Sequence, residues 1–275
     1  MTRSEHSPLL HNQMTEAAQT RGGSAEWPVS VDEHTAYCLQ IMTQMLMIHE
    51  KPALALEVMQ LTLDLSQQLV LRDPENRKYN HRLRYFSHLN ALLCLEHDEV
   101  LAYREICATI QQQLDGLDNP MVGGDGDISA YWCVMTCSLA PDAVEDYAAT
   151  LKLARQAVEN KSGAPLPLKW LGAILMRSGQ YDQAKAELEK ALTVTESKTS
   201  SKSDTHYFLA MTEHHLGHEQ AAREQLETAN QSAELELAND ETRWYRRATL
   251  ELLRDETTEL LGDAGNKATT TLTVP

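Results

Sequence analysis

At 275 residues the chain is long enough to bury a sizeable core, as one large domain or as two small ones. With 42% hydrophobic residues, 5% aromatic residues and 12 glycines, its composition is nearer to all-helical proteins than to β-sandwiches or barrels. Forty acidic against 24 basic residues give a formal net charge of −16, which argues against nucleic-acid and membrane partners because such a chain repels phosphate groups and anionic lipids.

Residues 1–30 show no hydrophobic periodicity, and they predict a disordered N-terminal tail. They also lack the apolar centre of a signal peptide, and no apolar stretch reaches the ~20 residues of a membrane-spanning helix. The five cysteines fall inside helical patterns rather than at the spacings of a disulfide framework, which favours reduced thiols. We therefore expect a cytoplasmic protein.

Five pairs of helical segments follow the tail, each with apolar residues three and four positions apart. A last helix over 239–261 should cap the stack, and residues 263–275 predict a disordered C-terminal tail. The basic stretch "RWYRR" in this last helix is either partner-facing or solvated. The expected pairs are 31–50 with 54–71, 79–96 with 100–114, 128–140 with 142–158, the two helices within 165–197, and the two within 203–236.

The fourth and fifth pairs repeat each other. Leu171 aligns with Leu209 and Gly179 with Gly217, in both cases at an offset of 38 residues, for example 209 − 171 = 38. Ala157, which ends the third pair, precedes Ala191 by 34 residues. A period near 34 residues with helix–turn–helix content predicts a helical solenoid. Its contacts between helices should bury Leu171, Gly172, Ala184, Leu188, Leu209, Ala222 and Leu226.

The stretch "LKWLGAILMRSGQYDQAKAELEKAL" resembles a tetratricopeptide repeat, whose pattern it matches at Leu171, Gly172, Gly179, Tyr181, Ala184 and Ala191. The resemblance implies a right-handed superhelix over 31–262, with its clearest repeats at 128–160, 165–197 and 203–236. More loosely, "WCVMTCSLAPDAVEDYAATLKLARQAV" resembles repeat regions of large bacterial proteins that also carry serine/threonine kinase or propeller domains. The sequence has no kinase motifs, so kinase activity does not follow from this resemblance.

The resemblance implies a non-catalytic scaffold that binds a protein or peptide in the concave groove of the superhelix. Aromatic and cationic side chains there would suit a peptide with apolar and acidic groups. Two alternatives remain open: an accessory module of a bacterial kinase or sensor system, and an enzyme without a recognisable motif. Trp170 and Phe208 could also simply pack between hairpins. The expected groove residues are Lys169, Trp170, Ala173, Arg177, Tyr207, Phe208, Met211, His214 and His215.

No spacing in the sequence predicts a catalytic, cofactor or metal site. Gly217 should end a helix between His214 and His218, which separates the histidines of "HHLGHE". Cys133 and Cys137 are interpreted as buried apolar residues, and the aspartates of "GGDGD" (Asp125 and Asp127) as turn and capping residues. The methionines of the first pair are interpreted as core residues rather than as a soft binding surface; they are Met42, Met45, Met47 and Met59.

Overall fold

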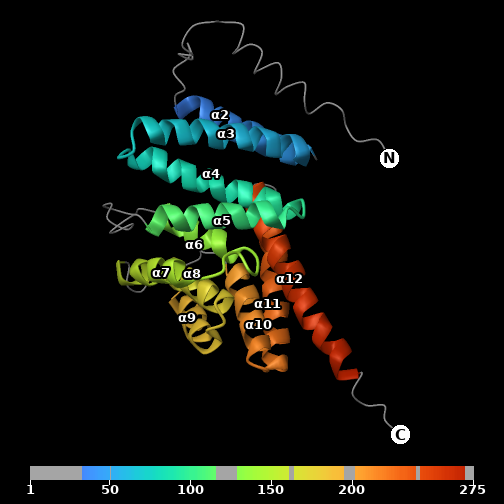
Figure 1. Ribbon diagram of the computed structural model, residues 1–275. Coiled ribbons are helices and arrows are strands. Elements are labelled where there is room, and N and C mark those ends of the chain that lie inside the picture. The colour runs from blue at the N-terminus through green and yellow to red at the C-terminus, as the bar shows by residue number, and fades with distance from the viewer. Residues whose placement is uncertain are drawn as a thin grey trace, which may run out of the picture.

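The computed structural model describes residues 33–49, 51–115, 129–160, 164–194, 202–239 and 242–269 (Figure 1). Within this part of the chain there are eleven α-helices, α2 to α12, and no strand, which confirms the predicted all-α fold class. The helices are α2 (Glu33–Ile48), α3 (Pro52–Arg72), α4 (Arg77–Glu96), α5 (Val100–Asp115), α6 (Ser129–Ser138), α7 (Ala148–Asn160), α8 (Pro165–Arg177), α9 (Tyr181–Val194), α10 (Ser203–His215), α11 (Glu219–Leu237) and α12 (Trp244–Thr269).

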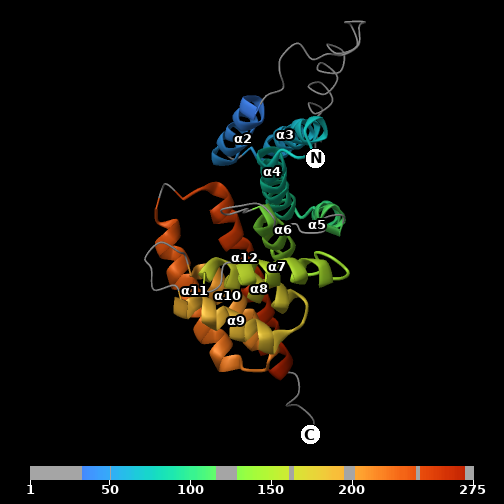
Figure 2. The same ribbon diagram turned by 90° about the vertical axis from the view of Figure 1, so that its left-hand side faces the viewer.

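The helices α2 to α11 form five consecutive hairpins that follow one another along the molecule (Figures 1 and 2). The first helices of neighbouring hairpins touch in succession, α4 against α6, α6 against α8 and α8 against α10. The second helix of a hairpin also packs against the first helix of the next, as α3 does on α4, α7 on α8 and α9 on α10. Each hairpin therefore buries its apolar faces mainly against its neighbours, which is the organisation of a helical repeat solenoid.

The third hairpin differs from the prediction at its turn. Its second helix was expected to begin at Asp142, but α7 begins at Ala148. The N–H of Ala143 donates to the hydroxyl of Tyr147 over 3.2 Å, and the carboxylate of Asp146 accepts the N–H of Ala148 at 2.8 Å. These local hydrogen bonds satisfy backbone and side-chain groups without a helix, so residues 141–147 form an irregular turn.

The fourth and fifth hairpins turn at equivalent glycines, as the repeat predicts. Gly179 has a φ of 76° and Gly217 a φ of 79°, in the left-handed region that glycine adopts without strain. After Gly179, the N–H of Gln180 donates to the carbonyl of Leu175 at 2.9 Å. After Gly217, His218 and Glu213 make the same bond at the same distance. Both helices therefore end in the same glycine-dependent way.

The predicted contacts between helices are largely confirmed. Leu171, Gly172, Ala184, Leu188, Leu209 and Ala222 are buried, whereas Leu226 is only partly buried. Helices α8 and α9 approach each other closely, because a Cβ added to Gly172 would lie 2.5 Å from Cγ of Leu188. A small residue is required at this position for the two helices to touch.

Replacing Gly172 by alanine should therefore destabilise the protein by about 1–3 kcal/mol, since Leu188 or the helix backbones must move to admit the methyl group. Urea unfolding followed by circular dichroism measures this difference. Gly262→Ala is the matched control: Gly262 also lies in a helix, but beyond the backbone of that helix nothing in the described chain is within 4 Å of the added Cβ. It should raise stability by up to about 1 kcal/mol. Equal effects of the two substitutions would contradict the close packing of α8 on α9.

Other predictions are corrected by the structure or lie outside the described residues. Met59 is buried and Met47 is partly buried, but Met42 and Met45 are 47% and 52% exposed, so the interpretation of both as core residues is wrong. The physical reason is that α2 packs with its opposite side, where Ala36 and Thr43 are buried. The predicted tail 1–30, the loop with Asp125 and Asp127, and residues 270–275 lie outside the described residues.

The last helix is placed differently from the prediction of 239–261. It begins at Trp244 and continues to Thr269, through part of the predicted C-terminal tail. It packs against α10 and α11, as the first helix of a further hairpin would, and it also reaches α4 and α2 (Figure 1). Its side chains Trp244, Ala248, Leu250 and Leu253 belong to the same core as those of the hairpins. Thus α12 connects the two ends of the stack.

Candidate functional site

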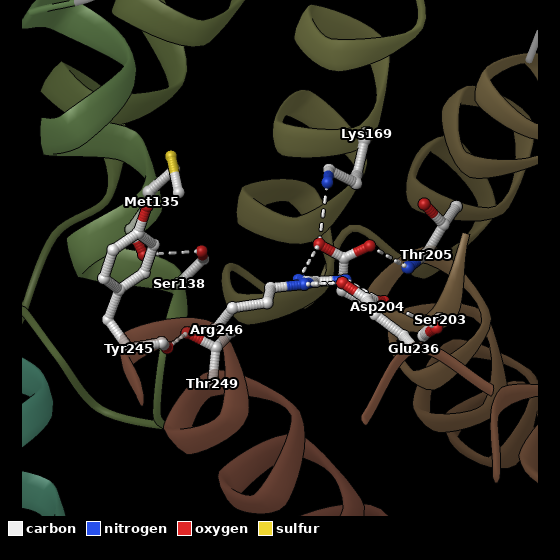
Figure 3. A network of polar contacts seen from close by, with 10 residues as sticks. All are labelled: Met135, Ser138, Lys169, Ser203, Asp204, Thr205, Glu236, Tyr245, Arg246 and Thr249. Atoms are coloured by element: carbon white, nitrogen blue, oxygen red, sulfur yellow. Dashed lines mark hydrogen bonds and ion pairs between the residues drawn. The ribbon is translucent and has the colours of Figure 1, made fainter. Parts of the chain in front are cut away.

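A network of charged side chains joins α12 to the fourth and fifth hairpins (Figure 3). Asp204 of α10 is fully buried and accepts hydrogen bonds from Nζ of Lys169 at 2.7 Å and from Nη1 of Arg246 at 3.0 Å. Arg246, on α12, also donates through Nε to Glu236 of α11 at 2.6 Å. Four helices thus contribute one charged group each to a mostly buried cluster.

The network holds Asp204 in its ionised form. Burial alone would raise the pKa of this carboxyl group, but the ammonium of Lys169 and the guanidinium of Arg246 outweigh it and lower the pKa to about 2. The stabilisation from the ionised carboxylate is therefore present above its ordinary pKa of 3.8 and is lost as the pH falls through about 2.

A second set of polar contacts lies further along α12. Arg177, at the end of α8, pairs with Glu256 through both of its terminal nitrogens, one of them at 2.7 Å, and donates from Nε to the carbonyl of Ser138 at 2.9 Å. Nε of Arg254 donates to the hydroxyl of Tyr207 at 3.2 Å. The side chain of Arg177 is 3% exposed, so its charge is neutralised inside the protein.

Most of the expected groove residues do not face an open groove. Trp170 and Phe208 pack against each other, edge to face, with ring centroids 6.2 Å apart. The reason is that α12 packs on α10 and returns to α4, which fills the inner side of the stack where a groove was expected. The prediction that these residues line an open groove is therefore wrong, and their binding of a partner stays a prediction. The residues whose side chains are buried are Lys169, Trp170, Ala173, Arg177, Tyr207, Phe208 and Met211.

The two remaining predicted residues lie at the accessible end of α10. His215 stacks on Tyr181 with ring centroids 4.5 Å apart, and Nδ1 of His214 lies 3.2 Å from the carboxylate of Glu219. Helix α10 ends at His215, so His218 lies in the turn that follows. Nδ1 of His218 is 2.7 Å from the carboxylate of Glu213. Across the described ranges, no three His, Cys, Asp or Glu side chains form a group that could hold a metal ion. Cys133 and Cys137 are buried, as the sequence predicts.

The candidate site is instead a hollow of about 520 Å³ among four helices, which we call the aromatic hollow. Helix α2 provides amide and apolar side chains, α4 and α6 provide aromatic rings, the start of α12 provides a tyrosine, and the residue before α12 is an arginine. Apart from the exposed Ile41 and Arg243, its residues are half-buried, so each presents part of its surface to the hollow or to solvent. The lining residues are Gln40, Ile41, Gln44, His81, Tyr85, Trp132, Arg243 and Tyr245.

The rings of the hollow support one another. Tyr85 lies 4.8 Å from Trp132 between ring centroids and meets Tyr245 edge to face at 6.2 Å. Nη1 of Arg243 donates to the hydroxyl of Tyr245 at 3.0 Å. These contacts join α4, α6 and α12, so the rings are held in place from three directions, and ordered aromatic surface of this kind costs little entropy when a ligand binds.

Behind the hollow, Trp132 is backed by a buried histidine. The rings of His88 and Trp132 lie 5.2 Å apart, and Nδ1 of His88 lies 3.2 Å from Oγ1 of Thr136. Burial lowers the pKa of His88 to about 3, so this imidazole is neutral at physiological pH. The indole Nε1 of Trp132 has no hydrogen-bond acceptor among the described residues.

A second hollow of about 430 Å³ lies next to the first, on the side of α11. Arg243 and Tyr245 line both hollows, so the start of α12 separates two neighbouring depressions. The other residues of the second hollow are Leu235, Glu236, Asn239, Thr242 and Arg246.

The sequence pointed to only part of this site. The sequence leaves open whether the stretch "RWYRR" faces a partner or is solvated, and the structure shows that Arg243 and Tyr245 of this stretch line both hollows. The lining residues of α4 were not predicted, although His81 and Tyr85 are four positions apart and therefore share one side of a helix. Nothing in the local pattern indicated that this side would meet Trp132 of the next hairpin.

Comparison with known proteins agrees with the repeat. A tetratricopeptide repeat family model matches residues 170–198, which include the fourth hairpin from Trp170 onward. No curated protein matches the chain. None of the helices among the described residues combines the length and the apolar character needed to cross a membrane.

Proposed function

We propose that this tetratricopeptide-repeat-type chain is a non-catalytic interaction module that binds a peptide segment of a partner protein in the aromatic hollow. The premise is the repeat match together with the solenoid of helix pairs, since such repeats serve as protein–protein interaction modules. The observation that carries the proposal is the hollow itself, in which accessible aromatic rings and an arginine lie together on the first helices of three hairpins and on α12.

The composition of the hollow indicates the chemistry of the partner. Trp132, Tyr85 and Tyr245 offer apolar ring surface, and tryptophan, tyrosine and arginine are the residues in which interface energy concentrates. Arg243 adds a cation to the lining of the hollow, and no Asp or Glu is among the lining residues. In a chain of net charge −16, this local basic character favours an acidic ligand.

The ligand we propose is therefore a segment with an apolar or aromatic side chain next to a carboxylate. The apolar side chain would stack among Tyr85, Trp132 and Tyr245, and the carboxylate would pair with Arg243. Gln40 and Gln44 supply amides that can bond to an extended peptide backbone.

A partner captured from the native cell by the full chain and identified by mass spectrometry should lose affinity when the hollow is altered. We expect Tyr245→Ala and Arg243→Glu each to weaken binding of the purified partner about 30-fold or more, the effect of removing a hot-spot side chain of ~2 kcal/mol. Isothermal titration calorimetry measures the change. Thermal unfolding of the same variants shows whether the fold is retained.

Two further variants locate the site. Arg104→Glu is the matched charge reversal, because Arg104 lies on α5 with 45% of its side chain exposed and does not line the hollow. It should leave the affinity unchanged. His215→Ala tests the accessible end of the groove that the sequence predicts. If both hollow variants bound the partner with native affinity and His215→Ala lost affinity, the binding site would lie at the end of α10, and the proposal would be contradicted.

A further inference from the structure

Helix α2 exposes an apolar side that no other part of the described chain covers. We call it the α2 seam; its exposed fractions are 38% for Ile41, 47% for Met42, 52% for Met45 and 58% for Ile48, and Cys38 is also exposed. Isolated exposed apolar residues are common on protein surfaces, but five on one side of a single helix are a contiguous patch.

The spacing of the seam fits another helix. Cys38, Ile41, Met45 and Ile48 follow one another at intervals of three, four and three residues, which is the a/d spacing of helices that pair side by side. No Asp, Glu, Lys or Arg occurs between Thr35 and Ile48, so nothing charged interrupts this stripe. Methionine side chains also adapt to different neighbours, which suits a packed contact.

The seam lies at an end of the stack. Both views show α2 and α3 at the opposite end of the hairpins from the end of α12 (Figures 1 and 2). The terminal repeat of a solenoid has no further repeat to cover it, and a polar outer side is therefore needed for solubility. Apolar side chains exposed on this terminal hairpin are therefore a candidate contact for a further helix.

The distribution of charge favours a second copy of the chain as the source of that helix. Residues 33–96 contain six Lys and Arg against seven Asp and Glu, a net charge of 6 − 7 = −1, so −15 of the total of −16 lies elsewhere. Two copies that meet through α2 would keep their strongly acidic parts apart. A two-fold contact also brings like residues together, which requires a surface without charges, as the seam is.

We propose that the α2 seam is the interface of a homodimer, in which α2 of one chain packs against α2 of a second copy. Five side chains of one helix form a small contact, so the dimer is weak and depends on concentration. Ile41 belongs to both the seam and the aromatic hollow, whereas Met45 and Ile48 do not line the hollow, so a substitution at Met45 tests this interface without altering the residues of the hollow.

Sedimentation equilibrium of the full chain, from low to high micromolar concentration, should show a monomer–dimer equilibrium. Met45→Glu should weaken dimerisation at least tenfold, because it places two carboxylates in an apolar contact. Leu235→Glu is the matched control: Leu235 lies on α11, is 80% exposed, and should leave the equilibrium unchanged. Mixing Met45→Glu with Met45→Lys should restore dimers.

Cys38 provides a second measurement that does not depend on stability. It is the one exposed cysteine of the five, so a bifunctional thiol cross-linker should join two chains through it in the wild type but not in Met45→Glu or Cys38→Ser. A wild-type chain that stays monomeric at every concentration overturns the proposal. So does a dimer that Met45→Glu leaves intact.

Discussion

Replacing Asp204 by alanine should destabilise the protein by about 3–5 kcal/mol, because the substitution leaves the charges of Lys169 and Arg246 without their shared carboxylate. Asp204 is fully buried and 9% of the Lys169 side chain is exposed, so Lys169 would be left as a buried charge with little access to water, whereas Arg246 keeps its contact with Glu236. Urea unfolding at neutral pH, followed by circular dichroism, measures the loss.

Asp142→Ala is the control for this prediction, since it removes a carboxylate from an exposed pair. Asp142 lies 3.4 Å from Arg104, with 84% and 45% of the two side chains exposed. Its removal should leave the unfolding midpoint nearly unchanged, because exposed ion pairs contribute little. Equal midpoints for Asp204→Ala and the wild type would show that water or movement of α12 compensates the buried charges, contrary to the geometry of the network.

The acid side of the stability curve gives an independent check. Because the pKa of Asp204 is lowered from 3.8 to about 2, the unfolded chain takes up a proton here at a higher pH than the folded chain. The contribution of Asp204 to stability should therefore disappear between about pH 4 and pH 2. Asp204→Ala should accordingly show a smaller further loss over this interval than the wild type.

Ending the chain after Asn239 should abolish stable folding. The truncation removes buried side chains that include Trp244, Leu250, Leu253 and Leu261. At roughly 1.5–3 kcal/mol for each large buried side chain, the loss approaches the whole stability of an ordinary domain. It also exposes the inner side of α10. We expect an aggregated or largely unfolded product, measured by light scattering and thermal unfolding.

A chain that ends at Gly262 is the matched control. It retains Trp244 to Leu261 and lacks only residues 263–275, which the sequence predicted as a disordered tail. This shorter truncation should remain soluble and unfold at the wild-type temperature. If the chain ending at Asn239 did the same, α12 would be dispensable for the fold, and its role would be assigned to partner binding.

The repeat could be recognised from the sequence because its information is local. Gly179 and Gly217 mark turns that need a left-handed backbone, and Gly172 marks a contact between helices that are adjacent in the chain. The periodic apolar residues define which side of each helix is buried. Even here the details depend on context: Leu226 is only partly buried, and α7 begins late because side chains in its turn bond to the backbone.

By itself, therefore, the sequence determined the helical class, the hairpins and the side of most helices that becomes buried. Only the tertiary structure decided what covers the inner side of the stack. Lys169 and Asp204 are 35 residues apart and Asp204 and Arg246 are 42 apart, and the aromatic hollow combines α2, α4, α6 and α12. The periodicity of a helix specifies which side is apolar, but not which distant helix meets it. Residues such as Trp170 and Tyr207 therefore fit a groove or a core equally well in sequence, and the return of α12 along the stack placed them in the core.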